Sequence, residues 1–213
     1  MITLYLVRHG ETVHNLEGRI QGHADSPLTP LGVKQAEAAA ARLASEKLDA
    51  IYSSDLGRAV ATAEIISAPH SLSVQTTELI REACFDKVQG LTQKEFKQQY
   101  PEDYRRWRED SVHYRPPGAE TLESLISRCG EFLQMISEKH KDGERLLAVV
   151  HGGSLRGLIC AACSLEPTFF RCLRMSNAGI SILDLGDRPA LSLFNDTCHL
   201  RKIRVTEEDA DNS

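Results

Sequence analysis

Strand-like and helix-like segments alternate along most of this chain, and this alternation is the feature that most constrains its fold. Aliphatic and β-branched runs predict strands, and apolar residues at three- and four-residue spacing predict the helices between them. The predicted strands cover residues 2–7, 50–53, 74–76, 146–150, 180–185 and 191–194, and the predicted helices cover about 30–47, 56–66, 122–136 and 154–163. Because the strands are apolar and separated by helices, we expect a three-layer α/β/α sandwich with a mostly parallel central sheet.

The 213 residues suffice for one domain with a sizeable core, and no linker or internal repeat divides the chain. Residues 84–118 are the least regular part, polar, aromatic and interrupted by three prolines. We interpret this stretch as a lid-like insertion over the site rather than as a second domain. The sequence therefore predicts a single domain over residues 1–205, followed by an acidic tail at 206–213.

The charge balance restricts the partners of the protein. Twenty-five Lys and Arg stand against 30 Asp and Glu, a formal net charge of −5, which argues against a general nucleic-acid binder. No apolar run approaches the roughly 18 residues of a membrane span. The segment Met1–Val7 is interpreted as a first strand, because it lacks the basic region and cleavage site of a signal peptide. A cytoplasmic location is the default expectation.

The six cysteines are too few and too scattered for a disulfide framework in a chain of this length. Cys160 and Cys163 do have C-x-x-C spacing, which is also found in redox and metal sites. No second cysteine pair and no H-x-x-x-H follows. We therefore interpret the pair as two small apolar residues on one helical face.

Histidines and arginines follow three of the predicted strands. Arg8 and His9 come directly after the first strand, Arg58 lies in the first turn of the helix after the second, and His151 and Gly152 follow residues 146–150. Ligands of open α/β sheets bind outside the carboxyl ends of the strands. Arginine forks and helix N-termini both match a tetrahedral anion, so these residues predict a phosphate site.

Each of these residues also has a structural interpretation. A single histidine at a strand end can be a packed residue, Arg58 can pair with Asp55 or Glu64, and Gly152-Gly153 can serve a turn. The joint pattern favours a site, because independent structural explanations would have to coincide at three strand ends.

The motifs RHGET at 8–12, SSDLGRAVATAE at 53–64 and HGG at 151–153 together resemble the histidine phosphatase superfamily, also called phosphoglycerate mutase-like. The resemblance extends from the first strand to about residue 200. It implies a phosphoglycerate mutase-like fold and a phosphomonoesterase that works through a phosphohistidine, without a metal or another cofactor.

The resemblance also implies roles for individual residues. His9 would attack phosphorus, which requires a neutral imidazole, and the charges of Arg8 and Arg58 should disfavour its protonation. Arg8, Arg58 and His151 would hold the phosphoryl oxygens in the transition state. The further phosphate-binding candidates that the resemblance implies are Asn15, Gln21 and Gly152.

Glu82 occupies the position where such phosphatases place their acid, which protonates the leaving group and later activates water. The alternative is a solvated surface carboxylate. The chain departs from the family pattern just after it, because Asp86, Val88 and Gln89 replace the usual Gly, Trp and Glu, while Gly90 is retained. These changes bear on local geometry and substrate preference more than on the chemistry.

A small phosphorylated metabolite is the expected substrate, with phosphoserine as the leading candidate. The stretches YPEDYRRW at 100–107 and NDTCHL at 195–200 are similar to metal-independent phosphoserine phosphatases, although α-ribazole phosphatases share related endings. His199 either lines the site or closes the last strand. The aromatic residues Phe85, Tyr100, Tyr104 and Trp107 either shape the lid or pack on the helix near 121–136.

Three other functions stay open. Cofactor-dependent phosphoglycerate mutases of this family carry a longer insertion than residues 84–118, which favours hydrolysis here. A catalytically silent phospho-ligand-binding protein is disfavoured by the complete set of site residues. A metal-dependent hydrolase would need a cluster such as H-x-H with Asp, which the sequence lacks. Leu165–Arg174 and the closing strands are candidate surfaces for a homodimer.

Overall fold

The computed structural model of the protein describes residues 1–201 and 203. The predicted acidic tail at 206–213, and with it the domain boundary at 205, lies outside the described residues. A six-stranded sheet in the order β3-β2-β4-β1-β5-β6 forms the centre of the molecule. Its parallel part consists of β1 (Ile2–Arg8), β2 (Ala50–Ser54), β3 (Val74–Thr77) and β4 (Arg145–Val150), and the antiparallel edge consists of β5 (Ile180–Leu185) and β6 (Ala190–Asp196).

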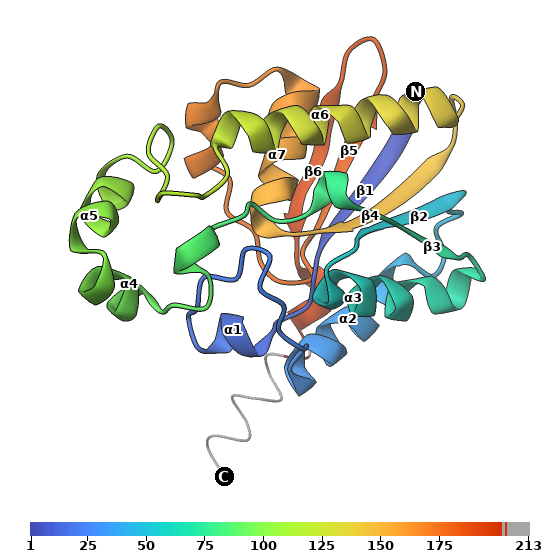
Figure 1. Ribbon diagram of the computed structural model, residues 1–213. Coiled ribbons are helices and arrows are strands. Elements are labelled where there is room, and N and C mark those ends of the chain that lie inside the picture. The colour runs from blue at the N-terminus through green and yellow to red at the C-terminus, as the bar shows by residue number, and fades with distance from the viewer. Residues whose placement is uncertain (202, 204–213) are drawn as a thin grey trace.

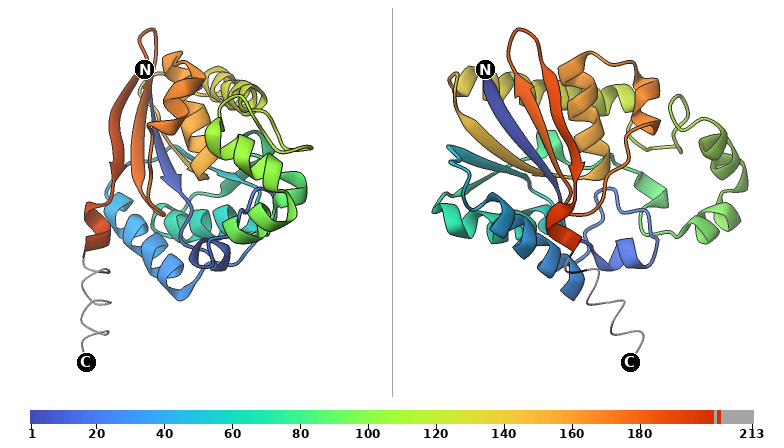
Figure 2. Two further views of the ribbon diagram at one scale, coloured as in Figure 1. Left: turned by 90° about the vertical axis from the view of Figure 1, so that its left-hand side faces the viewer. Right: turned by 180° about the vertical axis from the view of Figure 1, so that it is seen from behind.

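Helices cover both faces of this sheet, which confirms the predicted α/β/α sandwich (Figures 1 and 2). One layer contains α6 (Leu122–Lys139) and α7 (Gly152–Cys163), and the other contains α2 (Pro30–Leu43) and α3 (Gly57–Ser67). Alternate residues of β1 pack in opposite directions: Leu4 and Leu6 join the core under α6 and α7, and Tyr5 and Val7 join the core under α2 and α3. The strands are apolar on both faces for this reason.

The helix α2 begins as predicted and ends earlier than predicted. Thr29 caps it by accepting a hydrogen bond from the backbone N–H of Gly32, and Pro30 occupies its first position. It ends at Leu43 rather than at about residue 47. The reason is tertiary, because the Glu46 carboxylate accepts hydrogen bonds from Tyr5 in the sheet and from Arg145.

The stretch 84–118, predicted to be the least regular part, contains two helices, α4 (Gln93–Gln99) and α5 (Pro101–Glu109). Thr92 and Glu95 form a capping box at the start of α4, a T-x-x-E signal that is present in the sequence. Figure 1 shows α4 and α5, in green, at the side of the molecule beyond the sheet. We call residues 84–118 the lid segment.

The aromatic residues of the lid segment pack mainly on one another. The ring of Phe96 is fully buried, and its centroid lies 5.4 Å from that of Tyr104 and 5.7 Å from that of Trp107. Phe85 packs against Trp107 at 6.4 Å and also touches the core that contains α6. These residues therefore form a small core of the lid segment itself.

Shorter helical turns complete the described chain. They are α1 (Val13–Leu16) and the 3₁₀ turns η1 (Ala68–His70), η2 (Glu78–Ile80), η3 (Asp86–Val88), η4 (Pro167–Arg171) and η5 (Cys198–Leu200). Cys160 is buried in the core and Cys163 packs against it, which confirms the structural interpretation of the C-x-x-C pair. None of the helices within residues 1–201 and 203 is long and apolar enough to cross a membrane.

Candidate active site

Sheet pairing brings the two predicted histidines together. Strands β1 and β4 are parallel neighbours, and their register pairs Arg8 with Val150, so that His9 and His151 both follow the last pair. The backbone N–H of His9 donates to the carbonyl of Val150 at 2.9 Å. The two imidazole rings lie 5.1 Å apart between centroids, and both residues are buried.

The surroundings of His9 suit a nucleophile. Its Nδ1 lies 2.7 Å from the carbonyl oxygen of Gly10, and a carbonyl can only accept, so Nδ1 carries the proton and Nε2 keeps its lone pair. Burial and the charges of Arg8 and Arg58 hold the pKa of His9 well below its ordinary value of 6.5. Burial is the largest cause of the lowered pKa, and the sequence does not reveal that His9 is buried. The imidazole is therefore neutral at physiological pH.

Buried nitrogen atoms without partners surround this histidine. Both ring nitrogens of His151, and Nε of Arg8 and of Arg58, have no hydrogen-bond partner among the described residues. Buried polar atoms are normally paired, so a group of unpaired ones points to a ligand site. Burial and the charges of Arg58, His9 and Arg8 also hold the pKa of His151 well below 6.5. A neutral His151 has one N–H to donate.

Arg58 is fully buried, and the loop that contains Gly22 and Ala24 holds its guanidinium in place. The sequence does not reveal that this loop lies beside Arg58. Its Nη2 donates to the carbonyl of Gly22 at 2.8 Å, and its Nη1 donates to that of Ala24 at 3.1 Å. Its acidic neighbour is Asp25 at 3.5 Å, so the suggested pairing of Arg58 with Asp55 or Glu64 is wrong. Asp55 instead binds Arg81 through two hydrogen bonds.

Glu82 is half-buried and turned toward the start of α7. Its Oε2 accepts from the N–H of Gly153 at 2.9 Å, and its Oε1 accepts from its neighbour Ala83 at 2.8 Å. A Cβ on Gly153 would overlap the Glu82 carboxylate, so glycine is required for this approach. The interpretation of Glu82 as a solvated surface carboxylate therefore does not describe its surroundings.

The backbone that carries Glu82 is held by a partly buried ion pair. Arg128 on α6 donates to the carbonyls of Leu79 and Glu82, at 2.9 Å and 3.0 Å. Its guanidinium also pairs with Glu120 at 2.7 Å. We infer that Arg128 positions the Glu82 loop against α7, a role that sequence reasoning missed.

Asn15 and Gln21 lie beside the loop that follows β1. The side-chain oxygen of Asn15 accepts from Thr12 and from the amide of Asn177, and that of Gln21 accepts from the Thr12 hydroxyl. These bonds use the oxygen ends, and the amide nitrogens are the ends that can donate to an anion. Asn177 also donates to the carbonyl of His9, and sequence reasoning did not single it out.

His199 contacts the loop that precedes β5. Its Nε2 lies 3.0 Å from the carbonyl of Ala178, whose N–H donates to the carbonyl of Arg8 at 2.9 Å. The residue therefore supports the backbone behind the site.

The unusual residues after Glu82 have specific structural roles. Asp86, where the family usually has glycine, adopts a φ of 42°, a left-handed conformation that Asp tolerates better than most residues. The side-chain oxygen Oε1 of Gln89 accepts from the backbone N–H of His23 at 2.6 Å and from that of Phe85 at 3.3 Å. Gln89 thus ties the lid segment to the loop that fixes Arg58.

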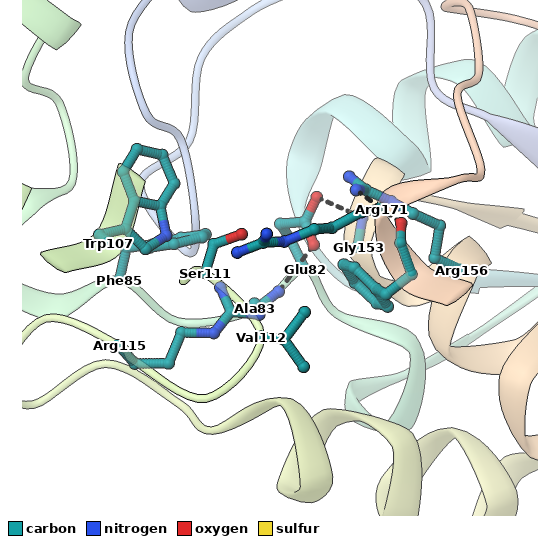
Figure 3. A pocket seen from close by; sticks show the side chains of 11 residues that line it. Glu82, Ala83, Phe85, Trp107, Ser111, Val112, Arg115, Gly153, Arg156 and Arg171 are labelled. Carbon is teal, nitrogen blue, oxygen red and sulfur yellow. Dashed lines mark hydrogen bonds between the residues drawn. The ribbon is translucent and has the colours of Figure 1, made fainter. Parts of the chain in front are cut away.

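Arginines missed by sequence reasoning lie next to Glu82 (Figure 3). Arg156 is one helical turn after Gly152 on α7, and its Nε donates to the Gly152 carbonyl at 2.8 Å. This i, i+4 spacing after the HGG motif is a signal that could have revealed it. Arg115 comes from the lid segment, and no pattern in the sequence places it here.

The arrangement suits phosphoryl transfer: it combines a buried neutral histidine with a free Nε2, cationic donors that have no partner among the described residues, and a carboxyl group beside them. Within the described part of the chain, no three His, Cys, Asp or Glu side chains are grouped so that they could hold a metal ion.

Comparison with known proteins gives the family. The model of the histidine phosphatase superfamily (branch 1) matches residues 4–197. The chain belongs to this superfamily and is a phosphatase of it. It is 38% identical to phosphoglycerate mutase-like protein 4 of Arabidopsis thaliana over 93% of this chain and 87% of that protein. It is 34% identical to phosphoserine phosphatase 1 of Hydrogenobacter thermophilus over 99% of this chain and 100% of that protein.

Solved structures agree with this assignment. YhfR of Bacillus stearothermophilus superposes with a TM-score of 0.88 at 32% identity, over 94% of this chain and 100% of that one. Phosphoserine phosphatase of Entamoeba histolytica in complex with phosphoserine has a TM-score of 0.82 at 29% identity, over 94% of this chain and 100% of that one. The α-ribazole phosphatase of Shigella flexneri has a TM-score of 0.85 at 28% identity, over 91% of this chain and 96% of that one. The phosphoglycerate mutase-like fold is therefore confirmed.

The two buried histidines should make the protein less stable in mild acid. In the unfolded chain each takes up a proton near pH 6.5, whereas in the folded chain each resists protonation until well below that pH. Because the unfolded state then binds more protons, the free energy of unfolding should fall as pH drops from 6.5 to 5, by at most about 1.4 kcal/mol per pH unit for each histidine. His70 and His199, whose pKa values burial also lowers, add a smaller part.

Urea unfolding of the wild type and of His151→Asn, between pH 5 and pH 8, measures this effect. The variant should show a clearly smaller fall in the free energy of unfolding below pH 6.5. The same slope in both proteins would contradict the assignment of a neutral buried His151.

Proposed function

We propose that the protein hydrolyses a small phosphomonoester, with phosphoserine as the leading candidate, through a phosphohistidine formed on His9. The observation that carries the proposal is the neutral His9 with its Nδ1 fixed by Gly10, surrounded by the unpaired nitrogens of Arg8, Arg58 and His151. These groups supply a nucleophile and the donors that a phosphoryl group needs.

In the first half of the reaction, Nε2 of His9 attacks phosphorus and the bond from phosphorus to the ester oxygen breaks. Arg8, Arg58 and His151 hold the phosphoryl oxygens, with Asn15, Gln21 and the start of α7 at Gly152 as further contacts. The departing alkoxide takes a proton from the carboxyl group of Glu82, beside the N-terminus of α7.

In the second half, water attacks the phosphohistidine and Glu82 accepts its proton. The bond between His9 and phosphorus breaks, and inorganic phosphate leaves with the lone pair restored on Nε2. The same carboxyl group therefore serves as acid and then as base, which returns the enzyme to its starting state.

Phosphoserine is the favoured substrate for two reasons. One relative named above is a phosphoserine phosphatase whose similarity covers 99% of this chain, and one similar structure is in complex with phosphoserine. Phosphoglycerate mutase activity is the second candidate, supported by the 38% identical mutase-like relative. α-Ribazole phosphatase activity is the third, supported by the similarity of folds.

A phosphate-release screen in the presence of EDTA tests the proposal. It compares phosphoserine, the phosphoglycerates, sugar phosphates and α-ribazole phosphate by kcat/KM, and phosphoserine should be hydrolysed best. A second assay tests the mutase alternative by incubating the protein with 3-phosphoglycerate and 2,3-bisphosphoglycerate. If the protein is a phosphatase, as proposed, the product should be free phosphate rather than 2-phosphoglycerate. Formation of 2-phosphoglycerate as the main product, or a requirement for added Mg²⁺, would contradict the proposed reaction.

A cytoplasmic location and a homodimer through Leu165–Arg174 and the closing strands stay predictions of the sequence. Size-exclusion chromatography with light scattering would measure the oligomeric state.

A further inference from the structure

A pocket opens on the side of Glu82 that faces the lid segment (Figure 3). Its inner wall contains Glu82 and Gly153, and its outer walls come from the lid segment, α7 and η4. Three arginines line it, namely Arg115, Arg156 and Arg171. Among the lining residues in the described chain, Glu82 is the one acid. The pocket is therefore cationic, within a protein whose net charge is −5.

Arg156 connects this pocket to the phosphate site. Its guanidinium stacks on Phe170, 4.4 Å from the ring centroid, so its position is fixed on one face. A Cβ placed on Gly152 would lie 3.6 Å from Nη2 of Arg156 and 3.8 Å from Nε of Arg8. The two guanidinium groups thus approach the same point beside Gly152. A substrate whose phosphate contacts Arg8 has its remaining part within reach of Arg156.

Arg115 and Trp107 bring unpaired donors to the same pocket. Nε of Arg115 and Nε1 of Trp107 are buried and have no hydrogen-bond partner within the described part of the chain. Arg115 also lies over the ring of Phe85, 5.5 Å from its centroid. A buried donor that is left unpaired has lost its hydrogen bonds to water without a replacement, which is unfavourable, most of all for a charged group. Donors in this state indicate that a ligand completes the pocket.

The charges in the pocket define the ligand. Burial is the main cause that lowers the pKa of Arg115, and the charge of Arg156 lowers it as well. The charges of Glu82, Glu120 and Glu123 act in the opposite direction. The Glu82 carboxylate already accepts from two backbone N–H groups and is needed for proton transfer. Arg171 is half-exposed and is paired with Asp110 at 3.4 Å. Within the described part of the chain neither Arg115 nor Arg156 forms an ion pair, and a second anion would supply a counter-ion for both.

We propose that this pocket binds a carboxylate on the leaving group of the substrate, held by Arg115 and Arg156 with the indole N–H of Trp107. A planar carboxylate matches the guanidinium fork, and the aromatic walls limit its size. The inference rests on the proposed phosphatase reaction and deepens it, because it selects esters whose leaving group carries a carboxylate over esters whose leaving group carries none. Phosphoserine and 3-phosphoglycerate both meet this requirement, and α-ribazole phosphate does not.

Matched substrate pairs test the assignment. Phosphoserine is compared with phosphoethanolamine, and 3-phosphoglycerate with glycerol 3-phosphate, because the members of each pair differ in the carboxylate. The measured quantity is the ratio of kcat/KM within each pair. The wild type should prefer the carboxylate-bearing member of each pair, and Arg115→Met or Arg156→Met should reduce that preference about tenfold or more.

Further variants separate binding from folding. Trp107→Phe keeps an aromatic wall and removes the donor, so it should reduce the ratio several-fold. Arg115→Lys keeps the charge without the fork and should give an intermediate ratio. The control is Arg108→Met, an exposed arginine of α5 outside the pocket, which should keep the wild-type ratio.

The outcomes distinguish this inference from the proposed function. Hydrolysis of both members of each pair at equal kcat/KM, or ratios that do not change in Arg115→Met, Arg115→Lys and Trp107→Phe, would overturn the carboxylate site and leave the phosphatase reaction standing. Failure of the wild type to hydrolyse any of these esters, or para-nitrophenyl phosphate, would instead overturn the proposed function.

Discussion

Replacement of His9 by alanine is expected to abolish phosphate release, with a loss in kcat of about a thousandfold or more. The reason is that Nε2 of His9 forms the bond to phosphorus, and the neighbouring donors cannot supply a nucleophile in its place. The assay uses para-nitrophenyl phosphate and phosphoserine with EDTA present. Radiolabelled substrate should also leave a phosphorylated wild-type protein and an unlabelled His9→Ala protein.

The control for this variant is His113→Ala, because His113 is an exposed histidine of the lid segment that pairs with Asp110. It should keep wild-type activity. A His9→Ala protein that unfolds at a temperature close to the wild type and still releases phosphate at the wild-type rate would rule out the phosphohistidine mechanism.

Replacement of Glu82 by glutamine should slow the hydrolysis of esters with poor leaving groups by about a hundredfold to ten-thousandfold. A serine or glycerol alkoxide must be protonated as it leaves, and an amide cannot supply that proton. Nitrophenolate needs little protonation, so the loss with para-nitrophenyl phosphate should be much smaller. The measurement is kcat for both kinds of ester in wild type and variant.

Glutamine at position 82 also has a structural effect. The carboxylate accepts from the N–H groups of Ala83 and Gly153, whereas the amide oxygen can serve one of them, at a cost of about 1 kcal/mol. This effect slows all esters alike and does not produce a dependence on the leaving group. Glu78→Gln, at an exposed residue of the same loop, is the control. Equal losses on both esters would show that Glu82 is structural.

The sequence predicted the layers of the fold because each of them depends on local patterns. Apolar strands and amphipathic helices alternate, and Thr29-Pro30 marks the start of α2. The length of α2 and the helices of the lid segment were predicted less well. The end of α2 depends on contacts of Glu46 with distant residues. The start of α4 was indicated by the capping box at Thr92, but the aromatic composition of this stretch did not suggest helices.

The candidate site follows the same division. The sequence by itself determined which residues follow the strand ends, and parallel pairing then places His9 beside His151. Only the tertiary structure decided that burial keeps His9 neutral, that Arg128 and Gly153 hold Glu82, and that Arg115 reaches the pocket. The physical reason is that these properties arise from contacts between residues far apart in the chain, whereas strand ends and helix starts are encoded by near neighbours.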